Sequence, residues 1–480
     1  MAEKGLVWIV AGLVALGGGA LAQEVAVKQY SDGSVYEGTF QDGRQHGQGT
    51  YRLPDGYEYS GAWVAGEIRG QGRARFPNGA VYEGAFEAGK PEGTGKITFP
   101  DGGSYDGDWT GGQMTGQGVA TYPGGVVYTG AMVNGLAQGR GVMEDPQGYR
   151  YEGDWSEGRR DGMALITYPD GARYDGAVVD GQRQGQGTLI MPDGLTYVGG
   201  WVDGQMHGEG KLTQPNGDLY DGGFETGLRS GQGRVSYADG GSYEGDFARD
   251  RRHGKGTYRA ASGMVYEGDW REGRIEGTGR MQHPDGAVYL GMFVADLPQG
   301  TGSMTWPDGT SYEGDWVDGA IEGQGVSRLA DGAVYEGAFR AGQRQGKGVL
   351  TLPDGYRFEG DWVDGRRDGQ GVAVYPDGSR YEGGFRADLR EGRGVLERPD
   401  GYRYEGDFLA GEPAGQGVAR WASGDVYEGA FAGGKPHGQG VARYASGQEA
   451  PGTWTNGLLT APAPAPEGEA GSGAVEPAAD

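Results

Sequence analysis

Histidine residues are the side chains of this sequence best suited to metal chemistry, and their spacing argues against it. The chain has five His and no Cys. Four of the His recur at one offset of a repeated segment, and the closest two of these, His207 and His253, are two repeats apart. That separation is on the order of 19 Å along a sheet, whereas the ligands of one metal ion lie within about 2–2.5 Å of it. The sequence therefore predicts no metal site.

Glycine and carboxylate residues also recur, without the context that catalysis needs. The Gly-x-Gly segments, such as Gly47-Gln48-Gly49, lack the following helix and the Lys-Ser/Thr pair of a phosphate loop. Asp and Glu are repeated along the whole chain, so nothing singles out one pair for acid–base work. We therefore expect no catalytic residue, no cofactor and no enzymatic activity.

The aromatic residues are stronger candidates because they are strictly periodic. An aromatic residue begins each of eighteen successive 23-residue segments, from Tyr36 to Tyr427, without insertion or deletion, and Phe358 is the only one that is not Tyr. Self-similarity at a fixed period of this size marks a repeat architecture. Counting the lead aromatic as position 1, position 5 is also aromatic in all segments except those with Met132 and Val178.

Each segment reads as a β-hairpin. Positions 1–5 and 14–18 alternate as strands do, joined by a Gly-bounded loop such as Gly43–Gly47. A Pro-Asp-Gly turn such as Pro54–Gly56 leads to the next segment. Glycine at positions 3 and 14 should leave room for a ring to lie flat on the backbone. We predict an all-β fold: a single-layer, elongated, twisted antiparallel ribbon of hairpins.

The ends of the chain differ from the array. Residues 1–22 have a Lys4 start, an apolar run and an Ala20-Leu21-Ala22 end, and read as a signal peptide, with an uncleaved N-terminal membrane anchor as the alternative. We expect residues 23–35 to form a capping half-repeat with a strand at 25–30. Beyond the array (36–449), residues 450–457 form a degenerate half-repeat with Pro451 on an edge strand, and 458–480 a disordered tail.

The net charge and the expected export of the protein limit the classes of partner that it can bind. The formal net charge of −25 argues against nucleic acid, whose phosphates need clustered Lys and Arg. Cleavage of a signal peptide predicts a protein of the periplasm, the cell envelope or the extracellular space.

The repeat resembles a known family. The pattern Tyr-Glu-Gly-x-Trp/Phe-x-x-Gly-x-x-x-Gly-x-Gly-x-x-x-x-Pro-Asp-Gly is similar to the MORN (membrane occupation and recognition nexus) repeat over residues 36–449. The resemblance implies a bacterial secreted multi-repeat protein with a twisted single-layer sheet and a non-enzymatic role. It also implies scaffolding, dimerisation or binding of protein partners through the aromatic groove, and for some members binding of acidic phospholipids.

We accordingly predict a scaffold that binds an envelope protein, or a second copy of itself, through its aromatic face. The partner-binding candidates are Tyr59, Trp63, Tyr105, Trp109, Tyr151, Trp155, Tyr197, Trp201, Tyr266, Trp270, Tyr312, Trp316 and Trp362. Whether these rings form an open partner surface or cover one another as the sheet twists is left open.

Two alternative ligands follow from other features. A basic rim could contact anionic phospholipid head groups, although the net charge opposes this; its candidates are Arg159, Arg160, Arg251, Arg252, Arg366 and Arg367. Exposed rings could instead stack on the sugars of a glycan or of the cell wall.

Overall fold

The computed structural model describes residues 7–8 and 25–463, which contain strands and turns and no helix. The chain divides into two compact units, and each is described here by itself. Unit 1 comprises Met1–Gly240 and Asp246–Asp250, and unit 2 comprises Gly241–Gly245 and Arg251–Asp480.

The strands follow one another in chain order. Those of unit 1 are β1 (Val7–Trp8), β2 (Ala26–Gln29), β3 (Val35–Gln41), β4 (Arg44–Arg52), β5 (Glu58–Val64), β6 (Glu67–Arg75), β7 (Val81–Glu87), β8 (Lys90–Thr98), β9 (Ser104–Thr110), β10 (Gln113–Thr121), β11 (Val127–Val133), β12 (Leu136–Glu144), β13 (Arg150–Ser156), β14 (Arg159–Thr167), β15 (Arg173–Val179), β16 (Gln182–Ile190), β17 (Thr196–Val202), β18 (Gln205–Thr213), β19 (Leu219–Glu225) and β20 (Leu228–Ser236). Strand β21 (Ser242–Ala248) has residues of both units. Those of unit 2 are β22 (Arg251–Arg259), β23 (Val265–Arg271), β24 (Arg274–Gln282), β25 (Val288–Val294), β26 (Leu297–Thr305), β27 (Ser311–Val317), β28 (Ala320–Arg328), β29 (Val334–Arg340), β30 (Gln343–Thr351), β31 (Arg357–Val363), β32 (Arg366–Val374), β33 (Arg380–Arg386), β34 (Leu389–Glu397), β35 (Arg403–Leu409), β36 (Glu412–Arg420), β37 (Val426–Ala432), β38 (Lys435–Arg443), β39 (Glu449–Thr455) and β40 (Leu458–Pro462).

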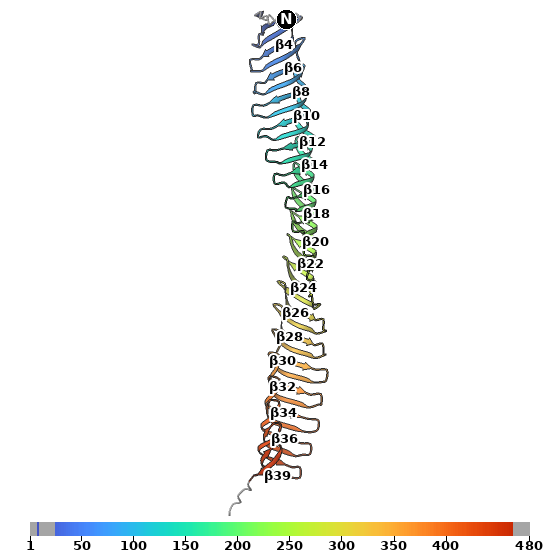
Figure 1. Cartoon of the computed structure of the whole chain (residues 1–480), viewed down its shortest axis with the longest axis vertical. Coiled ribbons are helices and arrows are strands. Elements are labelled where there is room, and N and C mark those ends of the chain that lie inside the picture. Colours follow the sequence, from blue (N-terminus) through green and yellow to red (C-terminus); the bar gives the residue numbers. More distant parts are fainter. Residues whose placement is uncertain (1–6, 9–24, 464–480) are drawn as a thin grey trace, which may run out of the picture. The chain divides into compact units, whose positions relative to one another are not determined.

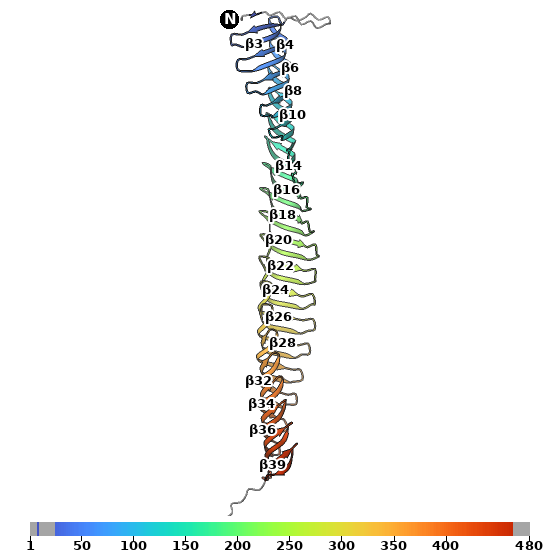
Figure 2. The same ribbon diagram turned by 60° about the vertical axis from the view of Figure 1, so that its left-hand side comes forward.

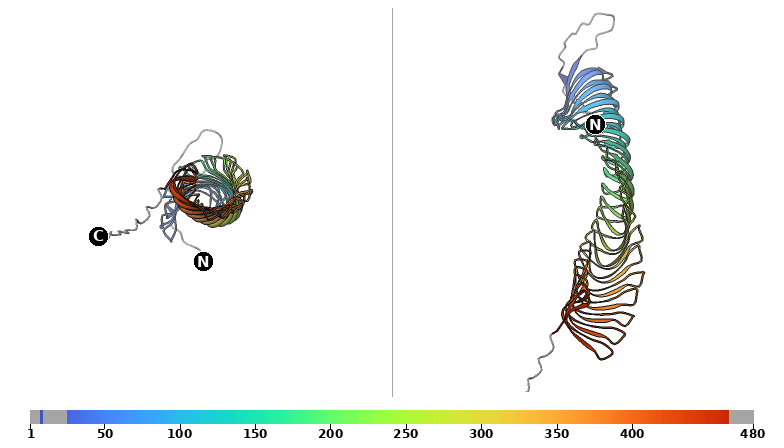
Figure 3. Two further views of the ribbon diagram at one scale, coloured as in Figure 1. Left: turned by 90° about the horizontal axis from the view of Figure 1, so that it is seen from below. Right: turned by 60° about the horizontal axis from the view of Figure 1, so that its bottom comes forward.

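Within each unit the strands form a single-layer antiparallel meander. Each strand pairs with the next along the chain, as β3 does with β4 and β4 with β5 in unit 1, and β31 with β32 in unit 2. Successive hairpins rotate about the direction in which they stack, so that they are seen broadside and then edge-on along each unit (Figures 1 and 2). The end view and the tilted view show the strands of a unit as one curved layer (Figure 3). The predicted all-β hairpin ribbon is confirmed.

The hairpin turn within each repeat is tighter than the sequence suggested. In the first repeat, Asp42 and Gly43 have φ of 49° and 74°, so two residues with positive φ connect β3 to β4. This is the primed two-residue turn whose twist matches that of the flanking strands. The predicted Gly-bounded loop Gly43–Gly47 is therefore wrong, because β4 begins at Arg44.

A β-bulge absorbs the residues that had been assigned to the loop. Gly38 pairs with Gly49 and Phe40 with Gln45, so one residue of β3 faces three of β4. Gly47, inside this bulge, has φ of 77°, a left-handed conformation that glycine adopts without strain. The glycine found at position 12 of every repeat is therefore needed for the left-handed backbone of a bulge within a strand, and not for a loop.

The Pro-Asp-Gly turns are confirmed as the links between repeats. Leu53 N donates to Tyr57 O at 2.8 Å, and Gly56 N donates to Leu53 O at 3.1 Å. Asp55 Oδ1 accepts from Tyr57 N at 3.0 Å, and Gly56 has φ of 95°. These bonds describe a turn closed by a glycine bulge, in which each of the three residue types has a separate task.

The termini correct two expectations. Leu458–Pro462 form strand β40, which pairs with β39, so the tail begins later than residue 458 and Pro451 is not on an edge strand. The predicted signal peptide lies outside the described residues except for Val7 and Trp8, which form β1 and pair with β2. In the described part of the chain, no helix is long and apolar enough to cross a membrane.

Candidate partner-binding surface

The lead tyrosines are buried against backbone glycines of their own repeat. Tyr105 is 1% exposed, and its Oη donates to Asp108 O at 3.0 Å. A Cβ added at Gly118, position 14, would come within 2.6 Å of Tyr105 Cζ. The ring therefore occupies the space that a side chain at this position would need, as predicted for the strand glycines.

The rings at position 5 link one repeat to the next. Trp109 packs edge-on against Tyr82 of the preceding repeat and Tyr105 of its own, with centroids 5.0 and 5.6 Å apart. Its Nε1 donates to Gly95 O at 2.9 Å. Repetition of these contacts builds a ladder of rings, interrupted where position 5 is Met132 or Val178. We call this side of the sheet the ring face, and each T-shaped pair contributes about 0.5–1.5 kcal/mol beyond burial.

The predicted partner-binding residues lie together in this ladder but are not accessible. The candidate side chain with the greatest exposure is Trp155, at 8%, while Tyr59, Tyr197 and Tyr266 are 0% exposed. Of the two alternatives that the sequence left open, the structure has the one in which Tyr and Trp cover one another. The rings form the hydrophobic core of each unit, and a partner would have to contact the residues beside them.

We expect the tyrosine ladder to make the protein sensitive to alkali. Desolvation raises the pKa of Tyr36, Tyr82 and Tyr289 to about 12. Because these folded-state pKa values exceed the unfolded value of about 10, the stability they contribute is present below pH 10 and lost as pH rises through 12. Tyrosinate absorbance and loss of the strand circular dichroism signal should appear together in that window. Ionisation centred near pH 10 with an unchanged circular dichroism spectrum would contradict this.

The basic rim divides into two sets. Arg159 and Arg251 are exposed on the rim, as is Arg366. The next residue in each repeat, at position 10, turns onto the ring face instead. The guanidinium carbon of Arg160 lies 5.8 Å from the Tyr149 and Tyr151 ring centroids, that of Arg252 4.1 Å from Trp270, and that of Arg367 5.6 Å from Phe385. Only half of the predicted basic rim is therefore exposed, and within that half Arg159 and Arg251 already lie 3.4 and 3.9 Å from the carboxylates of Asp180 and Glu272.

One arginine of this second set is held by a residue that replaces glycine. Asp388 occupies position 8 with φ of 72°, and its Oδ1 accepts from Arg367 N and Nε, both at 3.0 Å. We expect Asp388→Ala to cost about 1–2 kcal/mol, because it keeps a Cβ in left-handed backbone and removes a charged acceptor. Asp388→Gly, which relieves the backbone, should cost less. Hydrogen exchange of β32 and β33 measures both; equal losses would contradict the backbone contribution.

Accessible apolar grooves lie over the ring face in unit 1. One, of about 300 Å³, is lined by Phe99, Tyr105, Met114, Tyr122 and Met132 among others. The side chain of Tyr122 is 45% exposed, whereas Tyr105 forms the buried floor. The groove lies between two rows of side chains. Residues at position 10 of the repeats form the row near one long edge of the sheet, and residues at position 18 form the row near the other edge.

A neighbouring groove has the same construction. It measures about 240 Å³ and is lined by Tyr57, Phe76, Pro77, Phe86 and Pro91 among others. Across these repeats, position 10 and position 18 are apolar in succession, at Ile68, Pro91, Met114 and Ala137 and at Leu53, Phe76, Phe99 and Tyr122. The sequence analysis did not predict these rows. The signal was present in the sequence, since position 10 is apolar in four successive repeats and becomes arginine at Arg160 and Arg183.

The described residues hold no group of three or more His, Cys, Asp or Glu side chains that could bind a metal ion.

Comparison with known families identifies the repeat. The model of the MORN repeat matches eighteen times, each match beginning at a lead aromatic, over residues 36–56, 59–81, 82–104, 105–127, 128–148, 151–173, 174–196, 197–219, 220–242, 243–265, 266–288, 289–311, 312–334, 335–355, 358–380, 381–401, 404–426 and 427–449. A search of curated proteins found no match.

Solved structures give only distant likenesses. The TCP domain of SAS-4 (dCPAP) of Drosophila melanogaster, in complex with a proline-rich motif of Ana2 (dSTIL), is 15% identical with a TM-score of 0.21, covering 42% of this chain and 90% of that chain. The TCP10 domain of Danio rerio CPAP, with a STIL peptide, is 16% identical with a TM-score of 0.17, covering 55% and 95%. A streptogramin B lyase is 12% identical with a TM-score of 0.11, covering 66% and 91%. TM-scores this low support no argument about fold or function.

Proposed function

Because the chain belongs to the MORN repeat family, we propose that it is a non-catalytic repeat scaffold that binds a protein partner through the ring face of unit 1. The observation that carries this proposal is the pair of apolar grooves between the position 10 and position 18 rows. Concave apolar surface that stays accessible on a folded protein is typical of a site for another molecule. The buried rings hold the two rows in place, and the row residues make the contact.

The chemistry of the grooves favours a protein segment with apolar side chains. Met114 and Met132 are flexible thioethers that adapt to differently shaped partners, and Tyr122 offers an exposed ring with a polar tip. The anionic-lipid alternative has less support, because Arg160, Arg252 and Arg367 lie over rings.

Export is part of the same proposal. Lys4, the apolar run after it and the Ala20-Leu21-Ala22 end support secretion into the periplasm, the cell envelope or beyond, where the partner would be an envelope protein. N-terminal sequencing of protein from the envelope fraction should begin at Gln23. A chain that begins at Met1 and stays in the cytoplasm would overturn this part.

Site-specific photo-crosslinking tests the binding surface. A photoreactive residue at Tyr122 should capture a partner in cells. The same residue at Val119, on the other face of the same hairpin and 40% exposed, serves as the matched control. Met114→Asp, which places a charge in the groove, should reduce capture at Tyr122. Equal capture at both positions, or none at Tyr122, would contradict the proposal, and capture of a second copy of the chain would identify the partner as itself.

A further inference from the structure

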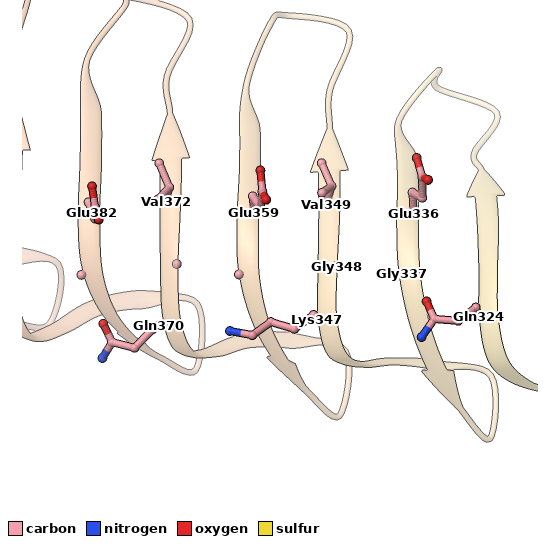
Figure 4. Close-up of a pocket in the computed structure, with 13 residues that line it drawn as sticks. Gln324, Glu336, Gly337, Lys347, Gly348, Val349, Glu359, Gln370, Val372 and Glu382 are labelled. Atoms are coloured by element: carbon pink, nitrogen blue, oxygen red, sulfur yellow. The ribbon is translucent and has the colours of Figure 1, made fainter.

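The face of unit 2 opposite the rings, called here the back face, carries a groove of its own. One row of side chains across this face alternates Glu and Val, because Glu336 pairs with Val349, Val349 with Glu359 and Glu359 with Val372. Glycines at positions 3 and 14 form the floor beside this row. A cavity of about 640 Å³ follows it from Gln324 to Gly383 (Figure 4).

A second cavity continues the groove to the end of the array. It also measures about 640 Å³ and is lined by Arg393, Val418, Val441 and Arg443, and by Pro451 and Ala463 among others. The first cavity ends on β33 and the second begins on β34, the next strand. The two cavities are therefore neighbouring parts of one groove that crosses the strands.

The chain itself enters this groove where the described residues end. Ala463 lines the second cavity, and its N donates to Pro451 O at 2.8 Å. The next residue, Pro464, has no N–H and cannot extend the ladder of β40. We propose that the C-terminal segment, residues 464–480, leaves the sheet at Ala463 and occupies the back-face groove of its own chain.

Length supports this occupant. The segment has 17 residues, which span at most about 53 Å at about 3.1 Å per residue in the extended conformation that Pro-rich sequences favour. From β39 back to β28, which carries Gln324, the groove crosses eleven strand spacings, on the order of 53 Å at about 4.8 Å each. The segment is long enough to reach both cavities and does not extend far beyond them.

Charge does not exclude this occupant, because most of the groove's own carboxylates are neutralised by arginines. The segment has four carboxylates, Glu467, Glu469, Glu476 and Asp480, and no Lys or Arg. Four of the five glutamates that line the groove already have arginine partners, at 2.5–3.1 Å: Glu359 with Arg357, Glu382 with Arg380, Glu405 with Arg403 and Glu428 with Arg443. Arg393 forms only a long ion pair, with its Nε 3.9 Å from Asp407 Oδ1, and its side chain is 87% exposed, so a carboxylate of the segment can reach it as well. This inference is independent of the ring-face partner, and any other occupant of the back face would have to displace the segment.

Pairs of introduced cysteines test the register directly, because the full chain has no Cys. Gly468→Cys should pair with Val418→Cys on β36, and Ser472→Cys with Val395→Cys on β34, positions reached at about 3.1 Å per residue from Ala463. Each matched pair should form an intramolecular disulfide at least about tenfold faster than the exchanged pairs, since binding in register raises the effective concentration. Non-reducing electrophoresis and intact mass measure this.

Controls separate the outcomes. Arg398→Cys, in the residue that follows β34 and whose side chain lies over the Tyr402 ring on the opposite face, should pair with neither tail cysteine at a comparable rate. If Val418→Cys does not fold, Gln416→Cys supplies a second position in the same groove. Equal rates for matched, exchanged and control pairs would overturn the proposal. Disulfide-linked dimers from the matched pairs would overturn it too, by placing the segment in the groove of a second copy.

Discussion

Tyr289→Ala is expected to lower the free energy of unfolding of unit 2 by about 3–5 kcal/mol, the range measured when large buried aromatic residues are truncated. Tyr289 is 0% exposed, and its ring lies 5.0 Å from Phe293 and 5.1 Å from Trp316, centroid to centroid. In a single-layer sheet no second layer can move in to fill the space, so the cavity should persist. The edge-on contact with Phe293 of the same repeat and the edge-on contact with Trp316 of the next repeat are lost with it.

Tyr289→Phe is the matched control. It removes only the Oη, which donates to Met292 O at 3.0 Å, and should cost about 1 kcal/mol. The array contains this substitution already: Phe358 is a lead aromatic, is 0% exposed, and keeps ring contacts of 5.3 Å to Trp362 and 5.0 Å to Phe385. A hydroxyl is therefore dispensable at this position, whereas a ring is not.

Each repeat contacts mainly its neighbours, so the loss should be local. Hydrogen exchange of the full chain should show faster exchange in β25, β26 and the adjacent strands of unit 2 for Tyr289→Ala, with strands far from the substitution unchanged. Uniform acceleration over the whole unit, or equal effects of the Ala and Phe variants, would show that the ladder does not stabilise repeat by repeat.

The period of the sequence was sufficient to predict the hairpins and the Pro-Asp-Gly turns that link them, but not the two-residue turn within each hairpin. Pro54, Asp55 and Gly56 each have a distinct conformational task, so the turn that they form could be predicted from residue type alone. The room left for rings by glycine could be predicted in the same way, since Gly118 stands beside the one residue type, Tyr105, that needs the space.

The exposure of the rings could not be predicted from the period. A repeat of 23 fixes which residues share a face but not how each side chain turns on that face. Position 10 shows the difference: Arg160 reads as a rim residue in the sequence, yet it lies over Tyr151, while Met114 at the same position leaves a groove. The bulge brings position 10 onto the ring face, and it follows from a two-residue turn between β3 and β4. The sequence did not indicate this turn, because the glycines at 43 and 47 suggested a longer loop between them.

Gly302→Ala should be strongly destabilising in the normal chain and nearly harmless once Tyr289 is truncated. A Cβ on Gly302, position 14 of this repeat, would lie 2.6 Å from Tyr289 Cζ, and the backbone beneath the ring cannot recede without breaking the pairing of Gly302 with Gly291. Overpacking of this kind costs about 1–3 kcal/mol. In the Tyr289→Ala background the added methyl group would enter the cavity left by the ring.

A double-mutant cycle isolates this coupling. The two changes should compensate by about 1–3 kcal/mol, measured by hydrogen exchange of β25 and β26 in the single and double variants. The control is a glycine in an open turn of the same unit. Gly309→Ala, where a Cβ would meet nothing within 4 Å but φ is 89°, should cost the same whether or not Tyr289 is present.

The array provides one natural instance of alanine at position 14, and the tryptophan of that repeat lacks the hydrogen bond that Trp109 makes. Ala164 replaces glycine at this position of its repeat, where Tyr151 is still 0% exposed. In the same repeat Trp155 Nε1 is buried without a hydrogen-bond partner, whereas Trp109 Nε1 donates to Gly95 O at 2.9 Å. Since Trp155 packs 5.2 Å from Tyr151, a small displacement of the tyrosine ring by the Ala164 methyl group would also move the indole away from its acceptor. The cost of a methyl group under the ring is then transmitted along the ladder. If the losses in free energy of unfolding caused by Gly302→Ala and Tyr289→Ala simply added in the double variant, glycine at position 14 would not be there to make room for the ring.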